Sequence, residues 1–198
     1  KELTLESVKA DIYSRNNPTL TPIDIEFYAT TVHRILELKK KHNAVILGHN
    51  YMEPLVFGLS EQSEQGDSLG LSMSAVQTDS EFIIFNGVRF MAETAKILNP
   101  NKRVLIADKT AGCSLADDFR AEDVRILKEQ YPGVPVMIYI NSYADAQAEC
   151  DVCCTSANAE QIAMSMPGDE LIFVPDLFFA QNLEKVLEGK KKILYPGK

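Results

Sequence analysis

The stretch "RVLIADKTAGCSLADDF", residues 103–119, contains the repeating unit of the fold. Residues 103–108 are mostly apolar and do not alternate with polar residues, so they predict a short strand buried on both faces. A Gly-Cys pair follows, and residues 114–119 predict a helix that begins behind a serine cap. Cys113 therefore lies between a strand end and a helix start, where α/β proteins place ligand-binding groups.

The same alternation of strand and helix patterns recurs along the chain. Apolar runs of strand length occupy residues 44–50, 81–87, 103–108, 134–141, 151–156, 170–176 and 191–197. Helical patterns occupy residues 66–78, 90–100, 122–133, 143–150, 158–168 and 180–189, and a longer one spans 21–43 behind Thr21 and Pro22. This alternation predicts parallel sheets with helices on both faces.

The break "EQYPGVP", residues 129–135, separates two similar sets of these patterns. The predicted organisation is an N-terminal helical segment over residues 1–43, a first α/β domain over 44–131 and a second over 132–198, whose completeness stays open. The predicted fold class is α/β, with two similar three-layer α/β/α domains built on parallel sheets.

Composition excludes some classes of function. The formal net charge of −8 argues against a nucleic-acid or membrane partner, although a local pocket can still bind an anionic small molecule. No apolar run has the length of a membrane span, and the N-terminal residues show no secretory signal. Four cysteines are too few for a disulfide scaffold in a chain of 198 residues, so we expect a reducing, cytoplasmic location.

Polar side chains cluster at the carboxyl ends of the predicted strands, where α/β sheets bind ligands. These candidates are His49, Asn50, Tyr51, Asn86, Cys113, Tyr139, Asn141, Thr155, Ser156, Asn158 and Asp176. In "GHNY", His49 and Tyr51 are two residues apart and can supply and accept protons from one side of a crevice. A histidine hydrogen-bonded into a loop explains the same pattern, and spacing alone slightly favours that alternative.

Two strand-to-helix turns have the composition of anion sites. Ser68 in "QGDSLGLS" and Ser156 in "CCTSANAE" each stand near a helix start, where backbone N–H groups attract anions. A plain N-cap is the commoner meaning of either turn. The presence of both turns suits a substrate with carboxylate or phosphate groups at more than one point.

The cysteines have different predicted roles. Cys150, Cys153 and Cys154 resemble a metal motif, but Cys153 and Cys154 are adjacent in a strand and point to opposite faces, so buried free thiols are the better interpretation. Cys113 lies outside a strand, and the residues alone leave open whether it fills a turn or carries chemistry.

Seven motifs resemble quinolinate synthase and occur in that family's order. They are "GHNY", "GDSLGLS", "GVRFMAETAKILNP", "AGCSLADDF", "YIN", "CTSANA" and "YPGK", and the resemblance runs from Thr21 to Lys198. The most specific parts of the resemblance are "FMAETAKIL" and "GCSLAD". Three stretches differ from the family's usual sequence: "FNGV", "PDLFFAQNL" and "MEPLVFGLSEQSEQ".

The resemblance implies three similar α/β domains around a pseudo-threefold axis, of which this chain matches the first two. It implies a [4Fe–4S] cluster held by one cysteine from each domain, with Cys113 as the first ligand. The other two ligands are missing from this chain, because the sequence stops at "YPGK" before the second and lacks the third domain. We therefore expect the chain by itself to be inactive.

The implied reaction condenses iminoaspartate with dihydroxyacetone phosphate, loses phosphate and water, and yields quinolinate for NAD biosynthesis. His49 and Tyr51 match the family's acid–base pair. The matched substrate-binding positions are His49, Ser68, Tyr139, Ile140, Asn141 and Ser156, and the implied metal ligand is Cys113. The implied functional neighbour is the oxidase that supplies iminoaspartate.

One alternative stays open at this stage. A non-catalytic α/β module, either an anion binder or a thiol redox protein that uses Cys150 and Cys153, has many of the same features. Iron and sulfide content after anaerobic reconstitution separates the two interpretations.

Overall fold

The computed structural model describes residues 2–15 and 20–195, except the side chains of Ser68 and Leu69. The chain divides into two compact units, residues 1–111 and 112–198. The division falls between Ala111 and Gly112, earlier than the predicted boundary between residues 131 and 132. The reason is the helix over Ala121–Gln130, whose Val124 and Leu127 pack in the core of the second unit.

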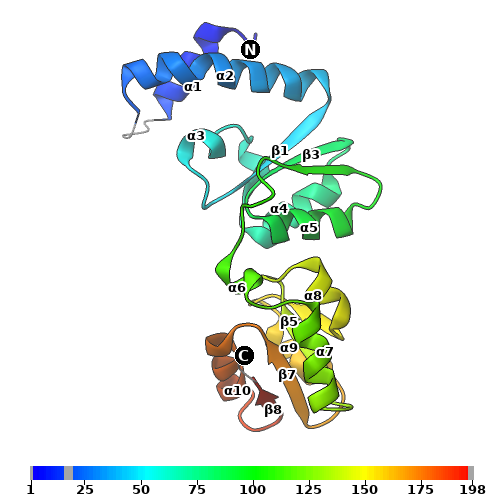
Figure 1. Cartoon of the computed structure of the whole chain (residues 1–198). Helices are drawn as coiled ribbons and strands as arrows, with labels where there is room; N and C mark the ends of the chain where they lie inside the picture. The colour runs from blue at the N-terminus through cyan, green and yellow to red at the C-terminus, as the bar shows by residue number, and fades with distance from the viewer. Residues whose placement is uncertain (1, 16–19, 196–198) are drawn as a thin grey trace. The chain divides into compact units, whose positions relative to one another are not determined.

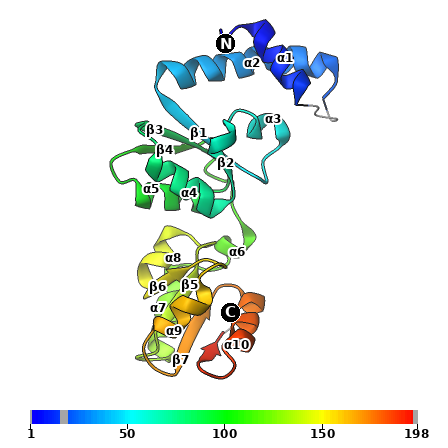
Figure 2. The ribbon, with the colours of Figure 1, turned by 180° about the vertical axis from the view of Figure 1, so that it is seen from behind.

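The first unit (Figure 1) contains a four-stranded parallel sheet with the strand order β2-β1-β3-β4, and Figure 2 labels all four strands. Its elements in chain order are α1 Leu5–Ser14, α2 Pro22–Lys41, β1 Ala44–His49, α3 Pro54–Phe57, a 3-10 turn Gln62–Glu64, β2 Gln65–Gly66, α4 Ser68–Gln77, β3 Phe82–Asn86, α5 Arg89–Leu98 and β4 Arg103–Ile106. The predicted strands over 44–50, 81–87 and 103–108 are confirmed with shorter ends. The two-residue strand β2 is too short to give a sequence pattern and was not predicted.

Among the described residues before the first sheet, Leu5–Ser14 and Pro22–Lys41 form the helices α1 and α2. Thr21 caps α2 by accepting a hydrogen bond from the Asp24 N–H, and Pro22 occupies the first turn. Helix α1 lies beside α2 (Figure 2), and Val8 and Ile12 of α1 form a small apolar core with Ile25 and Ala29 of α2. Leu55 and Leu59, in and just after α3, extend this core, so the segment packs on the first unit.

Helices lie on both faces of the first sheet. Helices α4 and α5 cover one face, on which Leu47, Ile83 and Phe85 are fully buried (Figure 1). On the other face, the end of α2 and the sheet line an open apolar pocket of about 350 Å³. Alternate residues of the strands, such as Ile46 and Ile84, line this pocket, as the period of two of a strand requires.

The second unit repeats the architecture with the strand order β6-β5-β7-β8, again all parallel. Its elements are α6 Ser114–Asp117, α7 Ala121–Gln130, β5 Val136–Tyr139, α8 Ala144–Glu149, β6 Val152–Cys154, α9 Ala159–Ser165, β7 Glu170–Val174, α10 Leu177–Val186 and β8 Lys192–Leu194. The predicted helix after Cys113 is only four residues long. Its N-cap is Cys113 rather than a serine, and the Cys113 side chain makes no capping hydrogen bond.

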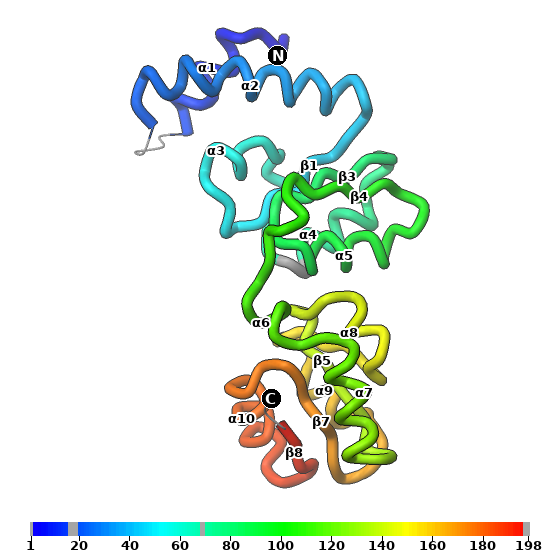
Figure 3. The backbone as a smooth tube through the Cα atoms, viewed as in Figure 1, coloured from blue at the N-terminus to red at the C-terminus, as the bar shows by residue number. Residues whose placement is uncertain are grey.

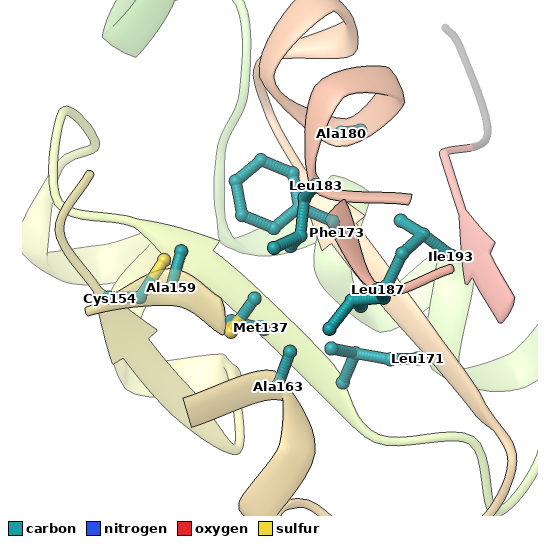
Figure 4. Packing of buried hydrophobic residues seen from close by; sticks show 10 residues of the cluster. All are labelled: Met137, Cys154, Ala159, Ala163, Leu171, Phe173, Ala180, Leu183, Leu187 and Ile193. Atoms are coloured by element: carbon teal, nitrogen blue, oxygen red, sulfur yellow. The ribbon is translucent and has the colours of Figure 1, made fainter. Parts of the chain in front are cut away.

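Alternate residues of the second sheet face opposite helical layers. Val136 and Ile138 of β5 pack with α7 and α8 on one face. Met137 of the same strand packs with α9 and α10 on the other face, in the cluster shown in Figure 4. The prediction of two α/β units with parallel sheets flanked by helices is therefore confirmed.

Candidate active site

The carboxyl edge of the first sheet gathers several of the candidate side chains. In the strand pairing, His49 at the end of β1 lies opposite Gly66 of β2, and the preceding Gly48 lies opposite Asn86 of β3. The strands are parallel, so their carboxyl ends meet at one edge and bring His49, Asp67 and Asn86 to the same region. His49 and Asn86 are both buried there.

His49 and Tyr51 contact each other directly. The Tyr51 backbone N–H donates a hydrogen bond of 3.2 Å to His49 Nδ1. Their rings meet edge to face, with centroids 4.5 Å apart and an interplanar angle of 72°. Since Nδ1 accepts this hydrogen bond, a neutral His49 carries its proton on Nε2. His49 is 4% exposed and Tyr51 is 84% exposed, so the pair combines a buried imidazole with a phenol open to solvent.

Burial lowers the pKa of His49 below the ordinary histidine value of 6.5, and the nearby Asp67 carboxylate opposes this shift. The unfolded chain takes up a proton on His49 at a higher pH than the folded chain does. His49 therefore contributes stability above the unfolded pKa, and that contribution is lost as the pH falls toward the folded pKa.

We expect the free energy of unfolding to decrease as the pH falls from about 7 to about 5, and His49→Asn to flatten this dependence. Urea unfolding at several pH values, for the parent and the variant, measures the two slopes. Identical slopes would contradict a buried neutral imidazole at this position. A histidine NMR titration gives the pKa of His49 independently.

The start of α4 carries the first predicted anion site. Asp67 caps this helix, and its Oδ1 accepts a hydrogen bond of 2.8 Å from the Gly70 N–H. The Gly70 N–H, which a bound anion could otherwise use, is therefore already hydrogen-bonded to the Asp67 carboxylate. Ser68 is the first residue of α4, but its side chain lies outside the described residues.

The carboxyl edge of the second sheet carries the next group of predicted residues. Tyr139 ends β5 and pairs in register with Cys154 of β6. The Ile140 N–H then donates a hydrogen bond of 2.9 Å to the Cys154 carbonyl, and Asn141 follows. Ser156, two residues beyond β6, is exposed. The predicted strand-end positions 139–141 and 156 thus belong to neighbouring strands of one sheet.

Internal hydrogen bonds fix the turn after β5. The hydroxyl of the fully buried Ser142 donates to the Tyr139 carbonyl at 2.8 Å. Gln147 Nε2 donates to the carbonyls of Ser142 and Ile140 at 2.8 and 3.3 Å. The Tyr139 ring contacts the Phe179 ring edge to face, with centroids 5.1 Å apart. The Ile140 N–H and carbonyl therefore both have hydrogen-bond partners within the unit.

The Asn158 side chain stabilises the turn after β6. Asn158 Oδ1 accepts hydrogen bonds from the Thr155 backbone N–H at 2.7 Å and from the Thr155 hydroxyl at 3.0 Å. These bonds close a loop around Ser156, whose side chain is exposed. Thr155 and Asn158 thus serve this turn, and Ser156 is the better-placed anion-binding hydroxyl.

The four cysteines differ in environment. Burial raises the pKa of Cys150 and of Cys154 to about 12. Desolvation of the sulfur also raises the pKa of Cys153 to about 11, although part of this residue is exposed. Cys154 packs in the core of the second unit, as Figure 4 shows, while Cys153 is exposed, so adjacent strand residues do face opposite sides. Raised thiol pKa values disfavour the thiolates that a redox pair or a metal site requires.

Cys113 has the features of a single metal-binding thiol. It is free, partly exposed and placed in a loop, with its carbonyl accepting a hydrogen bond of 2.8 Å from the Asp117 N–H. Across the part of the chain that the structure describes, no three His, Cys, Asp or Glu side chains gather to hold a metal ion. Within the described residues, Cys113 is therefore a single partly exposed thiol without neighbouring metal-binding side chains that would complete a site.

Two comparisons with known proteins find sequence similarity over most of the chain. The family model described as NadA, quinolinate synthetase A protein, matches residues 33–198. Quinolinate synthase 2 of Mesorhizobium japonicum is 46% identical over 180 residues, which are 91% of this chain and 55% of that protein. Quinolinate synthase of Sinorhizobium medicae is 46% identical over 183 residues, 92% of this chain and 50% of that protein. The chain thus spans about half the length of the curated relatives it matches.

Within residues 2–15 and 20–195, none of the helices combines the length and the apolar composition that crossing a bilayer requires.

Proposed function

Because the chain belongs to the quinolinate synthetase A family, we propose that it forms part of a quinolinate synthase. The proposed reaction condenses iminoaspartate with dihydroxyacetone phosphate, releases phosphate and water, and gives quinolinate. The observation that carries the proposal is the family match over residues 33–198. The positions of the matched polar residues at the carboxyl edges of the two sheets support it.

In the proposed enzyme, Cys113 supplies one thiolate ligand to a [4Fe–4S] cluster. Cys113 and Cys150 are both partly exposed and lie outside the helices and strands, but burial raises the pKa of Cys150, as it does that of Cys154, well above the ordinary thiol value. When bound, such a cluster with an open iron coordination position supplies a Lewis acid. The chain spans about half the length of the curated relatives it matches, so we expect residues 1–198 alone to make no quinolinate.

His49 and Tyr51 are the proposed acid–base pair. His49 presents Nε2–H in its neutral form because Nδ1 accepts the Tyr51 N–H. Its lowered pKa keeps the imidazole neutral at physiological pH, so Nε2–H is a hydrogen-bond donor there. The exposed hydroxyl of Tyr51 can give a proton to a substrate oxygen or take one from it. The isomerisation and ring closure in the proposed reaction need such proton transfers.

The remaining matched residues are proposed to bind and orient the substrates. Ser68 and Ser156 would donate hydrogen bonds to carboxylate or phosphate oxygens, with Ser156 held in its turn by the Asn158 cap. Tyr139, which ends β5, and Asn141 would hold polar groups of the substrate, with Ile140 between them. The proposed functional neighbour is the oxidase that produces iminoaspartate.

The full-length protein tests the proposal directly. After anaerobic reconstitution with iron and sulfide, we expect a [4Fe–4S] absorption spectrum and quinolinate formation from iminoaspartate and dihydroxyacetone phosphate. Quantification of quinolinate by mass spectrometry measures the product, and residues 1–198 alone serve as the inactive control. A full-length protein that binds zinc or no metal, and forms no quinolinate, would contradict the proposal and favour a binding or redox module.

A further inference from the structure

A hydrogen bond ties the helical turn that follows Cys113 to the start of α8. The Tyr143 hydroxyl donates to Asp117 Oδ1 at 2.7 Å, and the two residues are 26 positions apart in the sequence. Asp117 ends α6, and Tyr143 is the N-cap residue of α8. The tube in Figure 3 shows α6 passing beside the start of α8. None of the roles proposed above uses this pair.

The pair contacts the backbone on both sides of Cys113. The Asp117 N–H donates to the Cys113 carbonyl at 2.8 Å, so one residue binds both Cys113 and Tyr143. On the preceding side, a Cβ placed on Gly112 would lie 2.7 Å from Asp117 Oδ2 and 3.3 Å from the Tyr143 hydroxyl oxygen. The pair therefore packs directly against Gly112, where only glycine fits without displacing the carboxylate.

Tyr143 is itself firmly held. It is 3% exposed, and the Arg120 guanidinium lies 4.6 Å from the centre of its ring. Arg120 in turn pairs with Asp145 of α8 at 3.5 Å. A buried ring that is stacked in this way gives its hydroxyl a fixed direction, so its hydrogen bond restricts Asp117 and the turn that carries Cys113.

We propose that Tyr143 and Asp117 are positioning residues that fix the backbone of the Cys113 loop and so direct the Cys113 thiol toward the iron it binds. The inference rests on the proposed function, because it takes Cys113 as the ligand. The substrates need not touch either residue. Loss of the hydrogen bond frees the loop and lowers the fraction of molecules in which the thiol is placed for ligation.

The experiment on residues 1–198 is hydrogen exchange of the peptide 112–119. We expect Tyr143→Phe to accelerate exchange of its protected amides about fivefold to tenfold, since one hydrogen bond to a carboxylate is lost while the ring stays. Asp117→Ala should accelerate exchange to the same extent. Asp117 is exposed, so its replacement should leave the core intact. Asp117→Asn keeps an acceptor and should restore exchange close to the parent rate. Tyr131→Phe, at the far end of α7, is the matched control.

The full-length protein provides the second readout, the rate of iron loss under a chelator after reconstitution. We expect Tyr143→Phe and Asp117→Ala to lose iron several-fold faster than the parent, with Asp117→Asn and Tyr131→Phe near the parent rate. Unchanged exchange in Tyr143→Phe and Asp117→Ala would overturn the pair as a restraint on the loop. Faster exchange with unchanged iron loss would overturn its positioning role. Iron retained by Cys113→Ala would instead overturn the proposed function, which separates the two failures.

Discussion

Cys113→Ala in the full-length protein is expected to abolish cluster binding. A [4Fe–4S] cluster bound by three cysteines loses one protein ligand in this variant, and alanine offers no replacement donor. Iron and sulfide analysis after anaerobic reconstitution measures the loss, with the absorption spectrum as a second readout. We expect iron content near background and no quinolinate formation. The partly exposed position of Cys113 in a loop means that the fold should survive the change.

Cys153→Ala is the matched control for this experiment. Cys153 is also exposed and belongs to the same unit, but desolvation of its sulfur raises its pKa to about 11 and disfavours the thiolate. We expect this variant to keep its full iron content. Normal iron content in Cys113→Ala would refute the ligand assignment. Loss of iron in Cys153→Ala alone would move that assignment to the strand β6.

The strand pattern could be predicted from the sequence because both sheets are parallel and covered by helices. Runs such as "AVILGHN" and "ELIFVPD" then have uninterrupted apolar central residues and end in polar residues. The prediction failed where this physical signal is absent. Strand β2 has two residues and gives no pattern, and α6 has four, so the predicted helix over 114–119 was too long. The unit boundary was misplaced because "EQYPGVP" is a turn within the second unit rather than a linker.

The candidate site was predictable to the extent that it depends on topology. Parallel strands bring their carboxyl ends to one edge. The strand pattern alone therefore grouped His49 with Asn86 and Tyr139 with Ser156. The hydrogen bond between Tyr143 and Asp117 could not be predicted. It joins the end of α6 to the start of α8 across 26 residues, and neither residue belongs to a recognisable sequence motif. The His49 tautomer likewise depends on one backbone N–H that only the folded turn supplies.

Tyr51→Phe in the full-length protein is expected to keep the cluster and lose turnover. Phenylalanine preserves the ring that contacts His49 edge to face at 4.5 Å, and it removes only the hydroxyl. Tyr51 is 84% exposed, so the hydroxyl contributes little to packing, and the fold and the iron content should not change. General acid–base catalysis contributes about 100-fold to 10,000-fold to a rate, which sets the expected decrease in kcat.

Steady-state quinolinate formation, normalised to iron content, measures that decrease separately from any loss of cluster. Tyr13→Phe removes a hydroxyl from another exposed tyrosine of the first unit and should leave kcat unchanged. A kcat for Tyr51→Phe within about twofold of the parent would rule out proton transfer by the phenol, because a catalytic proton donor cannot be removed at so small a cost. In that case His49 would have to transfer protons without the Tyr51 hydroxyl. Its Nε2–H stays available in the variant, because Nδ1 accepts the backbone N–H of residue 51.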